Sequence, residues 1–102
     1  MTNFQAHGAA SVQAILGRNG VAVEFTTVEC GDDPALKTVK GDVFLRSTFD
    51  YAGRKLDIYI YPDEAGFFVD SEWRIFEAPD YDTADELLSA FVGALEQEMA
   101  KG

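Results

Sequence analysis

The segment from Asp42 to Tyr61 constrains the fold more than any other part of the chain. Two stretches of alternating apolar and polar residues lie on either side of Ala52-Gly53, which we interpret as a two-residue hairpin turn. This turn sets Tyr51 opposite Arg54 and fixes every later pairing. One side of the predicted hairpin is then mostly apolar, with these pairs: Phe49 with Leu56, Ser47 with Ile58, and Leu45 with Ile60.

The opposite side of the predicted hairpin pairs residues of favourable or neutral character. These pairs are Asp50 with Lys55, Thr48 with Asp57, Arg46 with Tyr59, and Phe44 with Tyr61. Such cross-strand pairs are each worth a few tenths to about 1 kcal/mol. A one-residue slip would scramble both sides, so the register has two independent supports.

Upstream of the hairpin, residues 4–18 carry apolar side chains at helical spacing, and Asn19-Gly20 follows where a helix would end. The alternative is a pair of strands, 12–16 and 21–25, joined by that turn. Residues 21–29 are rich in β-branched side chains and predict a strand. Its alternation places the following residues on one side: Val21, Val23 and Phe25.

Downstream of the hairpin, turn residues separate two further predicted strands. Residues 62–66 predict a turn and residues 67–70 a short strand. Ser71-Glu72 predicts the next turn, which leads into a strand over 73–77. Pro79 then ends the sheet, because proline cannot continue a hydrogen-bonded ladder.

The last segment has the features of an amphipathic helix. Thr83 and Glu86 have the spacing of a capping box, and Lys101-Gly102 suits a helix end. Apolar residues recur at helical spacing: Ala84, Leu87, Leu88, Phe91, Leu95 and Met99. We therefore expect one α+β domain over residues 1–102, a two-layer sandwich. It would have an antiparallel sheet of four to five strands with an N-terminal and a C-terminal helix on one face.

The charge balance limits the choice of partner. Eighteen acidic and eight basic residues give a formal net charge of −10. Such a surface repels phosphate backbones and anionic lipids, so we expect no direct nucleic-acid or membrane binding. It attracts a basic partner, although acidity also serves solubility alone. The absence of a visible signal sequence and the single cysteine predict a cytoplasmic protein.

Few residues in this sequence suit catalysis or metal binding. His7 is the sole histidine and Cys30, beside a loop predicted exposed over residues 31–41, is the sole cysteine. A general base needs an orienting acid and a nucleophile, and structural zinc needs four ligands. The acidic run 80–86 begins like a calcium loop, but Asp85 stands where that loop needs glycine. We therefore predict no enzyme activity, no metal and no cofactor.

Two surfaces are candidate protein-binding sites. The first is the polar side of the hairpin: Phe44, Arg46, Asp57, Tyr59 and Tyr61. Tyrosine and arginine are enriched where interfaces carry their binding energy. The alternative is that this side is covered by the loop around Lys37 or by a second copy of the chain. The second surface is an acidic rim, whose alternative is a solvated turn and helix cap: Asp63, Glu64, Asp80, Asp82, Asp85 and Glu86.

From residue 54 onward, roughly half the chain resembles small acidic immunity proteins of bacterial polymorphic-toxin systems. The features that carry this resemblance are the segments 56–66, 73–77 and 80–83 and the amphipathic helix over 87–95. It implies a cytoplasmic bacterial protein that binds one toxin domain, often a nuclease, and occludes it. These families share no binding motif, so the resemblance assigns no functional residue.

Three other functions remain as alternatives. The order of a helix, a β-rich middle and a closing helix is similar to class I chaperones of type III secretion, which are homodimers that bind an effector. This sequence departs from them because it lacks a helix inside the β region. A phage-encoded inhibitor that mimics nucleic acid is supported by charge alone. A small enzyme using acid–base carboxylates is the remaining alternative.

Overall fold

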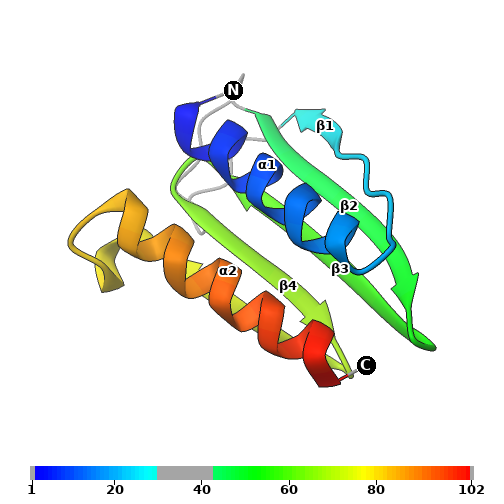
Figure 1. Cartoon of the computed structure of the whole chain (residues 1–102). Helices are drawn as coiled ribbons and strands as arrows, with labels where there is room; N and C mark the ends of the chain where they lie inside the picture. The colour runs from blue at the N-terminus through cyan, green and yellow to red at the C-terminus, as the bar shows by residue number, and fades with distance from the viewer. Residues whose placement is uncertain (1, 30–42, 102) are drawn as a thin grey trace.

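The computed structural model describes residues 2–29 and 43–101, and Figure 1 shows how their elements are arranged. The elements in chain order are α1 (Asn3–Arg18), β1 (Thr26–Glu29), β2 (Val43–Tyr51), β3 (Arg54–Tyr61), β4 (Glu64–Val69), β5 (Glu72–Glu77), a short 3-10 helix η1 (Ala78–Asp80) and α2 (Ala84–Lys101). The strands form one antiparallel sheet in the order β1-β2-β3-β4-β5. Both helices lie on the same face of this sheet (Figure 1), which confirms the predicted α+β fold. The predictions for Cys30 and for the loop over 31–41 fall outside the described residues.

Helix α1 begins and ends with complete capping motifs. The Thr2 hydroxyl accepts a hydrogen bond from the Gln5 backbone N–H at 3.2 Å, and the Gln5 side chain accepts from the Thr2 N–H at 2.9 Å. At the other end Gly20 has φ of +80°, and the Val21 N–H donates to the Leu16 carbonyl at 2.8 Å. The helical interpretation of this segment is confirmed, and the alternative of two strands is wrong.

The β2–β3 hairpin has the predicted register, from its turn to Leu45 opposite Ile60. Ala52 and Gly53 both have positive φ, 54° and 79°, as the tightest hairpin turn requires. Because side chains alternate between the two faces of a strand, this register fixes which hairpin residues face the helices.

The strand after this hairpin begins earlier than the sequence indicated. The predicted turn over 62–66 is only Pro62-Asp63, and β4 starts at Glu64. Ala65 is fully buried against the core, so the chain gains apolar contact by entering the sheet at once. The following turn, Asp70-Ser71, also lies one residue earlier than predicted and has φ of 53° and 66°.

Strand β1 is shorter than the predicted strand over 21–29, since only Thr26–Glu29 pairs with β2. The Val23 carbonyl instead accepts a hydrogen bond from the Gln13 side chain of α1 at 3.3 Å. The preceding residues still face the predicted side: Val23 is buried, and Val21 and Phe25 pack against the core.

Helix α2 starts at the predicted capping residues. The Thr83 hydroxyl accepts from the Glu86 N–H at 3.1 Å, while the Glu86 carboxylate accepts from the Asp82 N–H at 3.3 Å. The most deeply buried side chains of this helix have the predicted spacing: Leu87, Phe91, Leu95 and Met99. Neither helix in the described segments is long and apolar enough to cross a membrane.

The hydrophobic core fills the space between the helices and the sheet. Its sheet side contains the residues predicted to face inward: Leu45, Leu56, Ile58 and Ile60, joined by Ala65, Phe67, Val69 and Phe76. Gln5 is buried at the start of α1, and its amide donates to the carbonyls of Val43 at 2.7 Å and Ile60 at 3.0 Å. These bonds satisfy the buried amide and attach α1 to β2 and β3.

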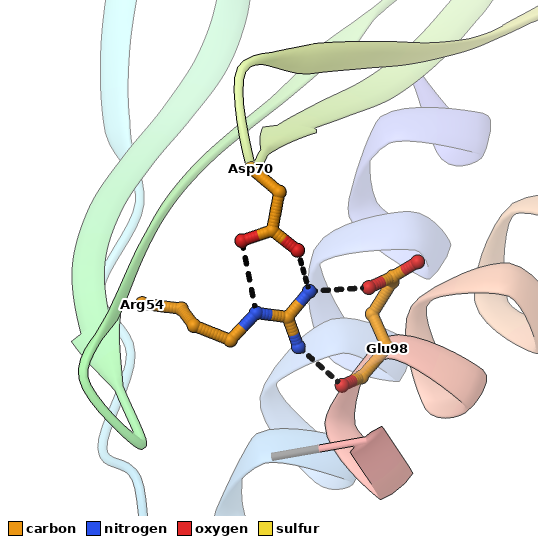
Figure 2. A network of polar contacts seen from close by, with 3 residues as sticks. All are labelled: Arg54, Asp70 and Glu98. Carbon is orange, nitrogen blue, oxygen red and sulfur yellow. Dashed lines mark hydrogen bonds and ion pairs between the residues drawn. The ribbon is translucent and has the colours of Figure 1, made fainter.

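A polar cluster holds the far end of α2 against the hairpin turns (Figure 2). The Arg54 guanidinium donates to Asp70 at 3.2 and 2.6 Å, to the Glu98 carboxylate at 2.6 Å and to the Glu98 carbonyl at 3.0 Å. These hydrogen bonds, first with Asp70 and then with Glu98, raise the pKa of Arg54. Three elements distant in sequence are thereby joined: the start of β3, the β4–β5 turn and α2.

Candidate functional site

The side of the sheet that faces away from the helices presents aromatic and charged side chains, and we call it the outer face. Its residues are Phe44, Arg46, Thr48, Asp57, Tyr59, Tyr61, Glu64, Phe68, Trp73, Ile75 and Glu77. They alternate along each strand with core residues such as Ile58 and Phe67, both fully buried. Trp73 and Ile75 are the large apolar residues most open to solvent within the described segments, with 50% and 49% of their surface exposed.

Part of the outer face forms an open hollow of about 410 Å³. The residues that line this hollow are Phe44, Arg46, Asp57, Tyr59, Tyr61, Glu64, Trp73 and Ile75. They come from four strands, because the registers align Arg46, Tyr59, Gly66 and Ile75 in one row across the sheet. The sheet pairing, more than any local motif, therefore creates the hollow.

The aromatic rings of the outer face form a continuous chain across the sheet. Phe44 stacks on Tyr61 with ring centroids 4.6 Å apart. Tyr59 meets Tyr61 edge to face at 5.1 Å and Trp73 at 5.4 Å, and Trp73 contacts Phe68 at 4.9 Å. Offset and edge-to-face contacts of this kind are favourable and hold the rings in fixed orientations.

Gly66 allows the Tyr59 ring to pack directly over the backbone of the neighbouring strand. A methyl group at Gly66 would come within 2.7 Å of the Tyr59 hydroxyl and within 2.7 Å of the Arg74 carbonyl. Tyr59 occupies the space that a side chain on the neighbouring strand would fill. The glycine predicted to serve a turn is instead a mid-strand residue that shapes the hollow.

At one end of the hollow Arg46 is bound to Asp57. The guanidinium of Arg46, whose side chain is 55% exposed, donates to both carboxylate oxygens of Asp57, at 3.1 and 2.8 Å. Thr48 also donates to Asp57 at 3.2 Å. The hydrogen bond to Asp57 raises the pKa of Arg46, so this end of the hollow carries a neutral, geometrically fixed ion pair.

The carboxylate of Glu64 has a different environment. It accepts a hydrogen bond from the Tyr59 hydroxyl at 3.2 Å and lies directly across from Glu77 on β5. Partial burial raises the pKa of Glu64, and the nearby Glu77 and Asp63 raise it further. Burial, with the adjacent Glu64, also raises the pKa of Tyr59. Like charges placed opposite one another on neighbouring strands destabilise a sheet.

The structure gathers the residues of the first predicted surface and divides those of the second. All five of the hairpin residues line the hollow, and Glu64 of the acidic rim joins them. Asp63 and Asp82 line a smaller hollow of about 220 Å³ between the β3–β4 turn and α2. Asp80 is exposed on η1 and lines neither hollow. The acidic rim is therefore not one continuous site.

Trp73 and Ile75 belong to the hollow but were not among the predicted site residues. The alternation of the strand does indicate their side of the sheet. Arg74 and the buried Phe76 face the helices, so Trp73 and Ile75 face the other way. Placing them beside Tyr59 also requires the β3–β4 and β4–β5 registers, and both depend on turns that the sequence located one or more residues away.

The described segments offer apolar surface and charged groups that could contact a ligand or a partner. His7 is exposed on α1, and α1 lies on the face of the sheet opposite to the outer face (Figure 1). Within residues 2–29 and 43–101, no three histidine, cysteine, aspartate or glutamate side chains are grouped so that they could hold a metal ion. Among the residues that the structure describes, the hollow offers aromatic surfaces, the neutral Arg46–Asp57 ion pair and the carboxylate of Glu64, which forms no ion pair with them.

Comparison with profiles of known protein families, with curated proteins and with solved structures finds no match to this chain.

Proposed function

We propose that this protein binds another protein through the outer face and acts as a stoichiometric inhibitor, without catalysis of its own. The observation that carries this proposal is the continuous chain of five aromatic rings that includes the half-exposed Trp73. Tryptophan, tyrosine and arginine dominate the binding energy of protein interfaces, and exposed aromatic patches mark such surfaces.

The net charge of −10 indicates what kind of partner fits. A basic protein is drawn to this chain by long-range attraction, which speeds encounter at low salt. Two copies of the chain repel one another, so charge favours a different, basic protein over a homodimer. A basic toxin domain, as in polymorphic-toxin systems, has the required chemistry, and occlusion by the outer face would neutralise it.

The test is to express the chain together with the product of the adjacent gene and to measure their association by calorimetry. Binding with a 1:1 ratio and inhibition of that product's toxicity are expected. Trp73→Ala should weaken binding about 30-fold, the effect of losing about 2 kcal/mol at a central interface residue. Glu96→Gln, an exposed position on α2, is the control and should bind like the wild type.

Two results would reject the proposal. One is a stable homodimer in sedimentation velocity that Trp73→Ala dissociates, because the outer face would then be closed by a second copy, as in a secretion chaperone. The other is unchanged association with the adjacent gene product when Trp73 is replaced.

A further inference from the structure

The half-buried carboxylate of Glu64 lies in an aromatic hollow and pairs with no cation of residues 2–29 and 43–101. The ion pairs of the described residues join Arg46 with Asp57 and Arg54 with Asp70 and Glu98, and none of them includes Glu64. Its polar contact is the Tyr59 hydroxyl at 3.2 Å, and its cross-strand neighbour is another glutamate, Glu77. An ionised carboxylate that loses water without gaining a cation is unfavourable in the free protein.

We propose that the hollow receives an arginine side chain of the protein partner, with its guanidinium against the tyrosine rings and ion-paired with Glu64. This inference rests on the proposed function and names the group that the outer face recognises. It assigns a role to Glu64 that the fold does not explain, since that position would be more stable with a neutral residue.

The rings around Glu64 suit a cation. Tyr59 and Tyr61 meet edge to face, at 73° with centroids 5.1 Å apart, and both rings line the hollow beside Glu64. A cation within about 6 Å of a ring centroid is attracted by the negative face of the ring. The hollow volume of about 410 Å³ leaves room for a whole side chain between these rings and Ile75.

Arginine fits this hollow better than lysine for two reasons. Its planar guanidinium stacks on aromatic faces, and its paired N–H groups fork onto a carboxylate. It is also less strongly hydrated than an ammonium group, which lowers the cost of entering a partly apolar site.

The protein's own Arg46 does not oppose a second guanidinium in the hollow. Its charge is neutralised by two hydrogen bonds to Asp57. It lies on β2, two strands from Glu64 on β4, a separation of about 10 Å across the sheet. The hollow therefore has a neutral end at Arg46 and a negative end at Glu64, whose cross-strand neighbour is Glu77.

The sole tryptophan, Trp73, lines the hollow and reports directly on its occupancy. We suggest titrating the protein with the peptide acetyl-Gly-Arg-Gly-amide and following Trp73 fluorescence and the NMR shifts of Tyr59, Tyr61 and Glu64. Saturable changes at these residues are expected. The matched peptide with citrulline, which keeps the shape and loses the charge, should bind about tenfold more weakly or not at all, and the lysine peptide should fall between them.

Glu64→Gln is the decisive variant, because glutamine retains an acceptor for the Tyr59 hydroxyl and removes only the charge. It should abolish the preference for arginine over citrulline. Glu72→Gln is the control, since Glu72 is exposed on the same strand as Ile75 but pairs with the inward-facing Val69. An equal affinity for the arginine and citrulline peptides in the wild type would overturn the inference.

The failure of this inference differs from the failure of the proposed function. If Trp73→Ala disrupts binding to the adjacent gene product and Glu64→Gln does not, the outer face binds its partner but the arginine site is wrong. If the arginine peptide binds in a Glu64-dependent way and the adjacent gene product does not bind, the guanidinium site stands and the assigned partner is wrong.

Discussion

The two faces of the sheet are made by the same strands and are similarly rich in large apolar and aromatic residues, yet they have different surroundings. Ile58 and Tyr59 are consecutive, as are Phe67 and Phe68, and in each pair the first residue is fully buried under the helices. The second residue of each pair lies on the outer face, where the rings contact one another and solvent. The inner face thus supplies most of the stability, while the outer face keeps apolar surface available for a partner.

The largest effect should come from truncating the inner face. Phe91 of α2 is fully buried and contacts the rings of Phe67 and Phe76. Phe91→Ala should lower the free energy of unfolding by about 3–5 kcal/mol, because it removes apolar burial and leaves a cavity. The matched outer-face change, Ile75→Ala, should cost less than about 1 kcal/mol at a half-exposed position. Urea denaturation measures both values, and similar losses would show that the two faces do not differ in this way.

The Arg54 cluster allows the same comparison within one network (Figure 2). The Glu98 side chain is 8% exposed and that of Asp70 is 64% exposed, although both bind the same guanidinium. Glu98→Ala should cost about 1.5–3 kcal/mol because it removes a charge-assisted hydrogen bond whose acceptor is almost fully buried. Asp70→Asn should cost only a few tenths, about 0.5 kcal/mol or less, as expected for an exposed ion pair. Thermal unfolding of both variants measures the two losses of stability. A larger loss for Asp70→Asn than for Glu98→Ala would contradict the prediction.

The packing of Tyr59 on the outer face requires a residue without a side chain at Gly66. Gly66→Ala should lower the free energy of unfolding by about 1–3 kcal/mol, because the new methyl group meets the Arg74 carbonyl and Tyr59. Gly93→Ala is the control, since no atom lies within 4 Å of its added methyl group and it occupies an exposed position in α2. That change should stabilise the protein by up to about 1 kcal/mol. Equal effects of the two substitutions in urea denaturation would contradict this role of Gly66.

The smallest predicted effect is that of replacing Glu64, which should raise the free energy of unfolding where the earlier truncations lower it. The pKa of Glu64 is raised in the folded protein by burial and by Glu77 and Asp63. The folded state therefore holds its proton more tightly than the unfolded state, and stability falls as pH rises from the ordinary glutamate value through the raised pKa. Glu64→Gln should stabilise the protein at pH 7 by about 0.5 kcal/mol, the size of a relieved like-charge pair. The gain should vanish at pH 4 in urea denaturation, and a variant less stable than the wild type at pH 7 would contradict it.

The fold was predictable where local signals agreed with one another. Ala52-Gly53 and the two complementary sides of the hairpin specified its register residue by residue. Thr83 and Glu86 specified the start of α2. The turns around β4 were predicted less well, because the glycine that looks like a turn residue serves the packing of Tyr59 in the middle of a strand.

The candidate site was predictable only in part, because the turns that set the registers of β4 and β5 were misplaced. Five of its residues lie on the hairpin, where one turn determines the whole pairing, but Trp73 and Ile75 reach the hollow through two further registers. Asp63 and Glu64 are adjacent in sequence but line different hollows, because consecutive side chains at the start of a strand point in different directions.

The sequence by itself determined the fold class, the hairpin register, the start of the C-terminal helix and the negative charge, because each of these follows from local spacing or from composition. Only the tertiary structure decided that five aromatic rings from four strands form one chain, and that Glu64 lies among them with the Tyr59 hydroxyl as its hydrogen-bond donor. The connected rings span 29 positions of the sequence, from Phe44 to Trp73. The sheet pairing that brings them together is a property of the whole fold and of no single segment.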